Sequence, residues 1–185
     1  MSFLQNIDLT IVAHERKWYV AAADFEQYVE QVCLRTLKHQ EKHLLKYCPN
    51  VASEAVGIAL VFVDSQEVQK LNKQFRGKDA PTNVLSFAAD MEGLQPENQE
   101  IVLGDVIFAY EVIEAEAAEQ GKDFIAHLTH MIVHGLLHLL GFDHMSESDA
   151  EIMERIEIDI LQSFDIANPY IIDNSGDKIN QLHGT

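Results

Sequence analysis

The segment from His134 to His144 constrains the fold of this chain most, because it predicts a metal site built on a helix. Its sequence is His-Gly-Leu-Leu-His-Leu-Leu-Gly-Phe-Asp-His. His134 and His138 are four residues apart, so a helix presents both imidazoles on one face. Gly141 can adopt the left-handed conformation that ends a helix, and the turn after it can bring His144 back to the first two histidines.

Three neutral nitrogen donors suit zinc, and they leave a fourth coordination position for water or substrate, as in catalytic rather than structural sites. We therefore expect one zinc ion per chain, bound by His134, His138 and His144. His127 and His130 fall on the same helical stripe, but His127 is on the order of 10 Å from His134 along the axis. We expect a structural or outer-shell role for both.

One position separates this segment from the metzincin protease signature. Metalloproteases with a His-Glu-x-x-His helix use the glutamate as general base. Gly135 occupies that position here, and glycine has no side chain that could act as a base. A metal site for different chemistry is therefore favoured over a peptidase or amidohydrolase site.

The histidine segment and two other stretches resemble the bacterial YbeY proteins. The YbeY signature is His-Gly-x-Leu-His-Leu-x-Gly-Tyr-Asp-His, and this chain matches it except that Phe142 replaces the usual Tyr. The replacement removes a hydroxyl but none of the ligands. The other matching stretches are Phe75–Asp79 with Pro81–Phe87, preceded by Leu71-Asn72, and Leu103–Ile107.

The resemblance implies a zincin-like fold and a zinc-dependent, single-strand-specific endoribonuclease. It implies a role in rRNA maturation, including processing of the 16S rRNA 3′ end, and in ribosome quality control. The implied partners are single-stranded RNA, rRNA, and the small ribosomal subunit with its assembly proteins. For such an enzyme, Gly135 would leave room beside the metal and avoid a negative charge next to a polyanion.

Arg76 is the candidate catalytic residue. A guanidinium can form bidentate hydrogen bonds to phosphate, which lysine cannot reproduce. The sequence places Arg76 at the start of a Gly/Pro loop over residues 76–82, and the resemblance favours catalysis over an ordinary solvated arginine. Asp143 could orient a metal-binding histidine through its second ring nitrogen, or cap the following helix. No residue is identifiable as the general base.

An alternative function is a ribosome-associated assembly factor whose metal is mainly structural and whose main activity is protein binding. An open coordination position and a reachable Arg76 favour the nuclease. A closed four-ligand site, with Arg76 pointing away, would favour the assembly factor.

The net charge of −17 argues against simple nucleic-acid binding, because phosphate-binding surfaces are normally basic. The basic residues are unevenly distributed, however, and a local basic patch could bind RNA with strong salt dependence. The basic residues form two clusters, which comprise Arg35, Lys38, Lys42 and Lys46, and Lys70, Lys73, Arg76 and Lys78. Both clusters could equally be solvated helix faces.

Hydropathy patterns predict an α+β fold: a small mixed four-stranded sheet covered by helices, one of them central and buried. The expected strands cover residues 7–11, 55–63, 83–87 and 102–108, the last interrupted near Gly104. The expected helices cover residues 24–46 (capped by Asp24), 64–75 (opened by an Asp64-x-x-Glu67 capping box), 110–120, 123–140 and 146–164. Helix 123–140 is apolar nearly all round, which is typical of a buried helix.

Residues 1–170 are expected to form a single metal-dependent hydrolase domain, and the polar tail 171–185 is expected to be disordered. Cys33 and Cys48 are interpreted as free thiols in a reducing cytoplasm. The chain has no run of 18 apolar residues, so no membrane helix is expected. The N-terminus lacks the features of a signal peptide, so a cytoplasmic location is expected.

Overall fold

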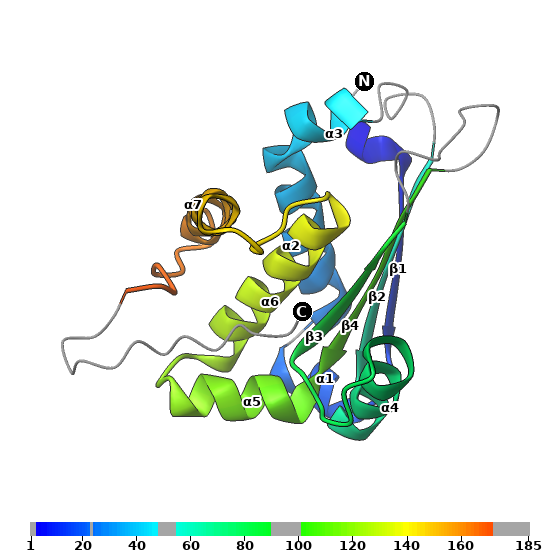
Figure 1. Cartoon of the computed structure of the whole chain (residues 1–185), viewed down its shortest axis with the longest axis vertical. Coiled ribbons are helices and arrows are strands. Elements are labelled where there is room, and N and C mark those ends of the chain that lie inside the picture. Colours follow the sequence, from blue (N-terminus) through cyan, green and yellow to red (C-terminus); the bar gives the residue numbers. More distant parts are fainter. Residues whose placement is uncertain (1–2, 23, 48–54, 90–100, 172–185) are drawn as a thin grey trace.

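The computed structural model describes residues 3–22, 24–47, 55–89 and 101–171 (Figure 1). The strands are β1 (Ile7–Ala13), β2 (Val56–Val63), β3 (Val84–Ala88) and β4 (Ile101–Ala109). The helices are the short 3-10 helix η1 (Phe3–Asn6), α1 (Arg16–Ala21), α2 (Phe25–His39), α3 (Glu41–Tyr47), α4 (Ser65–Arg76), α5 (Tyr110–Glu119), α6 (Phe124–Leu139) and α7 (Glu147–Gln162).

The four strands form one mixed sheet in the order β1-β2-β4-β3. β1 pairs with β2 and β2 with β4 in parallel, whereas the edge strand β3 runs antiparallel to β4. The predicted α+β class, with a mixed four-stranded sheet and covering helices, is therefore confirmed. No helix in the described part of the chain is long and apolar enough to cross a membrane.

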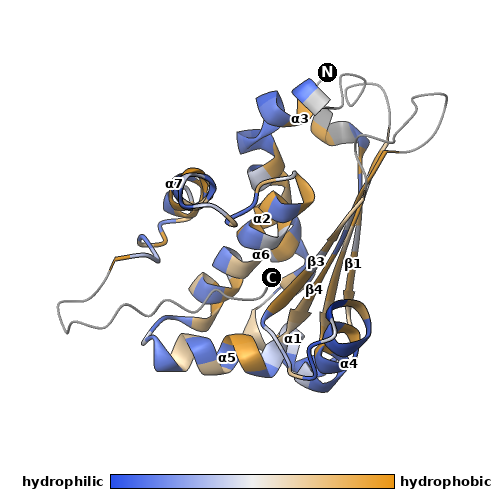
Figure 2. Ribbon diagram, viewed as in Figure 1, coloured by the Kyte–Doolittle hydropathy of each residue, from blue (hydrophilic) through white to orange (hydrophobic). Residues whose placement is uncertain are grey.

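Alternation along the central strand β2 divides the core between the two faces of the sheet. Leu60 and Phe62 belong to the large core cluster, which also includes buried residues of α2, α6 and α7. Val61 and Val63 pack instead in a small cluster beneath α4. Figure 2 shows the apolar residues that run along the strands. The sheet face with the large core cluster buries more apolar surface. The buried apolar side chains of α6 belong to this cluster.

Helix α6 is the predicted central helix, and its residues from His127 to Leu137 are all buried. Its first turn is capped by Asp123, whose side chain accepts a hydrogen bond from the Ala126 N–H at 3.0 Å. The helix contacts β3, β4, α2, α5 and α7. A helix enclosed by so many elements has little freedom to shift, so side chains on it are held in defined positions.

Two predictions at the N-terminal end were wrong. The single helix expected over residues 24–46 is two helices, because α2 ends at His39 and its C-cap Gln40 has a backbone (φ −96°, ψ 15°) outside the helical region. Asp24 adopts a positive φ of 53°, and its side chain makes no capping hydrogen bond. Helix α1 was not predicted. It is too short to be stable alone, but it is held by Trp18, which is fully buried against Phe62.

The predicted interruption of β4 at Gly104 is confirmed as a β-bulge. Gly57 pairs with Val102 and Ile58 with Gly104, so Leu103 is the additional residue. Gly104 has a φ of +130°, and a Cβ there would overlap the Phe87 carbonyl oxygen. Cys33 is a free buried thiol, as predicted, and burial raises its pKa to about 12. Cys48 and residues 172–185 lie outside the described residues.

Gly135 faces the sheet, which gives a different reason why glycine replaces the glutamate of the metalloprotease signature. A Cβ at this position would overlap Val106 Cγ1 and would lie 3.4 Å from Ser86 Oγ and Val84 Cγ2. The glycine therefore lets α6 pack closely against β3 and β4. The expectation that it leaves room beside the metal was wrong, because the space at Gly135 is filled by the strands.

We expect Gly135→Ala to destabilise the protein by about 1–2 kcal/mol. Overpacking a core typically costs 1–3 kcal/mol, whereas the better helix propensity of alanine returns up to about 1 kcal/mol. Val106→Ala removes the overlapping carbon, so the double variant should be more stable than the sum of the two single effects. Urea unfolding of the four proteins measures this coupling, and strictly additive effects would contradict the proposed overlap.

Candidate metal centre

The structure brings together the three histidines of the sequence motif. One nitrogen from each of His134, His138 and His144 lies within 4.8 Å of the others. His134 and His138 extend from the last two turns of α6, and their Nε2 atoms are 3.1 Å apart. The ring of His144 stacks on that of His134 at 5.5 Å between centroids. His134 is buried, whereas the other two are partly exposed, so one side of the group is open to solvent.

The turn after α6 positions His144. Gly141 has a φ of +83°, its N–H bonds the His138 carbonyl, and the Phe142 N–H bonds the Leu137 carbonyl, both at 3.0 Å. The Phe142 ring stacks on His43 at 4.4 Å. The imidazole of His43 also donates to the Leu140 carbonyl at 2.9 Å. Stacking on His43 needs an aromatic ring but no hydroxyl, so phenylalanine is sufficient at position 142.

His134 is held in one tautomer by a carboxylate from another helix. Its Nδ1 lies 2.8 Å from Oε1 of Glu157 on α7. An ionised carboxylate only accepts hydrogen bonds, so Nδ1 carries a proton, and in the neutral ring the lone pair is on Nε2. This Nε2 faces His138. Three imidazole nitrogens grouped in this way fit a zinc ion.

The protonation states of the other two histidines also suit metal binding. Burial, together with the neighbouring imidazoles of His134 and His144, lowers the pKa of His138 to about 4. Burial and His134 also lower the pKa of His144. At neutral pH both rings are therefore neutral, which is the form that binds a metal.

Sequence reasoning missed Glu157. Its side chain is fully buried, and its other oxygen, Oε2, accepts from His130 Nε2 at 3.1 Å and from the Tyr170 hydroxyl. Burial opposes ionisation of Glu157, but His130 and His134 outweigh it and hold the pKa of this carboxyl far below its ordinary value. The available signal was an acidic residue between Met153 and Ile160 on the apolar face of α7.

Asp143 has neither of its predicted roles. Its Oδ1 accepts a hydrogen bond from the His144 backbone N–H at 2.7 Å, not from an imidazole. The N-cap of α7 is Ser146, whose side chain accepts from the Asp149 N–H. Asp143 is next to His144 in sequence, but its short side chain reaches only the adjacent backbone.

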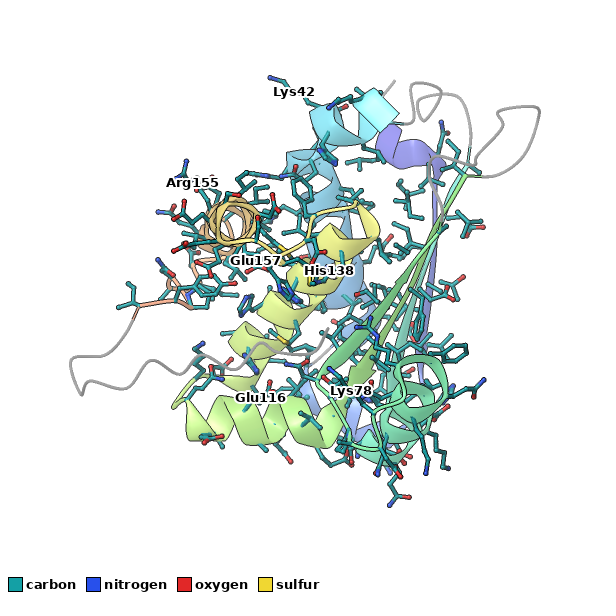
Figure 3. All side chains as sticks on the ribbon, in the orientation of Figure 1. Lys42, Lys78, Glu116, His138, Arg155 and Glu157 are labelled. Carbon is teal, nitrogen blue, oxygen red and sulfur yellow. The ribbon has the colours of Figure 1, made fainter. Side chains whose placement is uncertain are left out.

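His127 and His130 lie outside the three-histidine group, as predicted from the sequence. His130 is linked to His134 through Glu157, which is an outer-shell arrangement. The Nε2 atom of His127 lies 2.9 Å from Oε2 of Glu116 on α5. Glu116 also accepts from the Asn83 side chain. Figure 3 labels Glu116, His138 and Glu157 on their three helices.

Arg76 is the last residue of α4 and not part of the loop in which it was predicted. Gly77 ends the helix, with a φ of +71°. Arg76 Nη2 donates to the Ser86 carbonyl on β3 at 3.2 Å. The Ser86 hydroxyl in turn donates to the carbonyl of Gly135, the residue after His134. The exposed guanidinium is thus anchored to the strand that packs against the part of α6 that carries His134.

The family profile described as Endoribonuclease YbeY matches residues 12–165. The chain belongs to the YbeY family. The Endoribonuclease YbeY of Francisella tularensis subsp. novicida (strain U112) is 47% identical over 115 residues, which cover 62% of this chain and 71% of the relative. That of Sinorhizobium medicae (strain WSM419) is 41% identical over 148 residues, covering 79% of this chain and 83% of the relative.

The fold is similar to a solved structure as well. The solution structure of TM1509 from Thermotoga maritima matches with a TM-score of 0.52 and covers 92% of this chain and 99% of that chain. The identity between the two is 22%, so this likeness concerns the fold alone. The YbeY profile ends at residue 165, so it includes Glu157 but not Tyr170.

The metal-free protein should lose stability as the pH falls from 7 to 5. Folding lowers the pKa of His138 from an ordinary value of 6.5 to about 4, so in this range the unfolded chain takes up a proton that the folded chain does not. The free energy of unfolding should fall by on the order of 1–2 kcal/mol from this residue alone. Chelator-treated wild type and His138→Gln can be compared by urea unfolding at each pH. An equally steep decline in His138→Gln would contradict this assignment.

Proposed function

We propose that this chain is a zinc-dependent, single-strand-specific endoribonuclease of rRNA maturation. The proposed role includes processing of the 16S rRNA 3′ end and ribosome quality control, in the cytoplasm. The observation that carries the proposal is the group of three imidazoles, partly open to solvent, in a chain of the YbeY family. The matched relatives are named endoribonucleases, which supports a phosphodiester bond as the target.

Cleavage of a phosphodiester needs a nucleophile and stabilisation of the negative charge that develops on phosphorus. When bound, a zinc ion would supply Lewis-acid chemistry for both tasks. The proposed ligands are His134, His138 and His144. Burial keeps His138 and His144 unprotonated, and Glu157 directs the Nε2 lone pair of His134 toward the group.

Arg76 is proposed to bind the phosphate that is cleaved. Its hydrogen bond to the Ser86 carbonyl fixes the direction of the guanidinium before substrate arrives, and such preorganisation increases electrostatic stabilisation of a transition state. Ser86 also contacts α6 beside His134. Arg76 is therefore hydrogen-bonded to β3, and β3 packs against α6, the proposed metal-binding helix.

The cluster around Arg76 is the better candidate for the RNA-binding surface. In the other cluster, Arg35 packs over the Phe164 ring at 4.0 Å and donates to the Ser163 carbonyl, which is a structural use. In the Arg76 cluster, Lys73 pairs with Asp79 at 2.6 Å, but both side chains are more than half exposed. An exposed ion pair is worth little, so Lys73 can exchange this partner for a phosphate. RNA binding should therefore weaken strongly with salt.

The purified protein should contain about one zinc ion per chain. His138→Ala removes a proposed ligand, so it should lose most of the metal. His127→Ala removes a buried histidine of the same helix and should keep the metal, because His127 pairs with Glu116. Elemental analysis after dialysis measures both. Full zinc in His138→Ala, with loss in His127→Ala, would show that the ligands are wrongly assigned.

Arg76→Lys should cleave a single-stranded rRNA fragment about 30- to 1000-fold more slowly than wild type. Loss of one bidentate contact is expected to cost roughly 2–4 kcal/mol in the transition state, by analogy with removed oxyanion-hole donors. Arg155→Lys, at an exposed position on α7, is the matched control and should retain full activity. Zinc content and melting temperature confirm that each variant is folded and loaded.

Two results would contradict the proposal in different ways. Wild-type rates in both Arg76→Lys and Arg76→Ala would remove Arg76 from the catalytic machinery. A zinc-loaded wild type that binds ribosomal subunits but cleaves no single-stranded RNA would favour the assembly factor with a mainly structural metal.

A further inference from the structure

We propose that Glu157 is a positioning residue of the metal centre and that Tyr170 keeps its carboxylate in place. Glu157 holds His134 in the tautomer and orientation that direct Nε2 at the metal. Tyr170 lies beyond residues 12–165, which the YbeY profile matches. The inference rests on the proposed metal centre but not on RNA cleavage.

The first argument is the burial of the carboxylate. Glu157 has no exposed surface, and a buried carboxylate is costly unless it is paired and hydrogen-bonded. Two buried imidazoles and one phenol surround it: His134, His130 and Tyr170. Replacing such a polar cluster as a whole by packed apolar residues is often neutral or stabilising, so fold stability alone does not require it. The retention of a carboxylate therefore indicates a role toward its partners.

The second argument is how the donors are divided between the two oxygens. Oε1 accepts only from His134 among the described residues. Oε2 accepts from both His130 and Tyr170. The two bonds at Oε2 prevent the carboxylate from rotating, so Oε1 remains directed at His134. A metal-binding histidine typically donates its second N–H to such a carboxylate, which fixes the tautomer and makes the ring a better ligand.

The third argument is how Tyr170 is held. Its backbone N–H bonds the Asn168 side chain at 2.8 Å, and the neighbouring Pro169 carbonyl accepts from Lys122 Nζ at 3.2 Å. Burial and Glu157 raise the pKa of the Tyr170 hydroxyl, so it remains a protonated donor. The segment after α7 is thus fastened near the start of α6 and presents its phenol to the Glu157 carboxylate.

The same helix offers a matched control. His127 and Glu116 form a second imidazole–carboxylate pair at 2.9 Å, with the His127 side chain 2% and the Glu116 side chain 24% exposed. His127 is not in the three-histidine group. If such pairs only stabilise the packing of α6, replacing either glutamate should affect the protein in the same way. If Glu157 positions a ligand, only its replacement should change metal binding.

The test compares Glu157→Gln, Glu116→Gln and Tyr170→Phe by chelator competition for zinc and by the absorption spectrum of the cobalt-substituted protein. Glutamine has the shape of glutamate but no charge, and only one of its two terminal atoms can accept a hydrogen bond. We expect Glu157→Gln to weaken zinc affinity about 10- to 100-fold and to alter the cobalt spectrum. Tyr170→Phe should weaken affinity severalfold, whereas Glu116→Gln should leave affinity and spectrum unchanged.

Wild-type zinc affinity and cobalt spectrum in folded Glu157→Gln would overturn the proposal, and so would equal losses in Glu157→Gln and Glu116→Gln. If Glu157→Gln does not fold, Tyr170→Phe decides the question, because it leaves the carboxylate in place: a loss of affinity supports the proposal, and no loss overturns it. His138→Ala, measured in parallel, separates a failure of the positioning proposal from a failure of the proposed metal centre. Unchanged zinc binding in that variant would reject the metal centre itself.

Discussion

The burial of α6 is the constraint on which the rest of the structure depends. Its sequence combines apolar side chains with histidines on one stripe, and every residue from His127 to Leu137 is buried. The apolar side packs closely on the sheet because Gly135 has no side chain. The imidazoles on the other side need polar partners, since an unpaired polar group in the core is costly. Glu116 on α5 and Glu157 on α7 supply those partners.

The same pairing connects stability with metal chemistry. Burial keeps His138 neutral, and the Glu157 carboxylate leaves the Nε2 lone pair of His134 available. Features that make α6 a rigid part of the core therefore also prepare its last two turns to bind a cation. Two of the acidic residues that contribute to the net charge of −17, Glu116 and Glu157, form hydrogen bonds with buried histidines.

Much of the fold followed from patterns within single segments. The alternating and apolar runs predicted all four strands, and Gly104 marked the bulge. Asp64 accepts a hydrogen bond at the start of α4, where the capping box predicted it. The short helix α1, which was not predicted, depends on the packing of Trp18 against Phe62, a distant contact that local propensity does not report.

For the site, the sequence by itself determined the three histidines, because four-residue spacing and a glycine that ends the helix are local features. Only the tertiary structure decided which side chains form hydrogen bonds with the histidines of α6. Glu157 is 23 residues from His134, and Tyr170 is 40 residues from His130. Tertiary structure also attached Arg76 to Ser86 and gave Gly135 its packing role. Such partners depend on how α7, β3 and α6 pack against one another, and periodicity along one helix carries no information about the side chains that other elements bring to it.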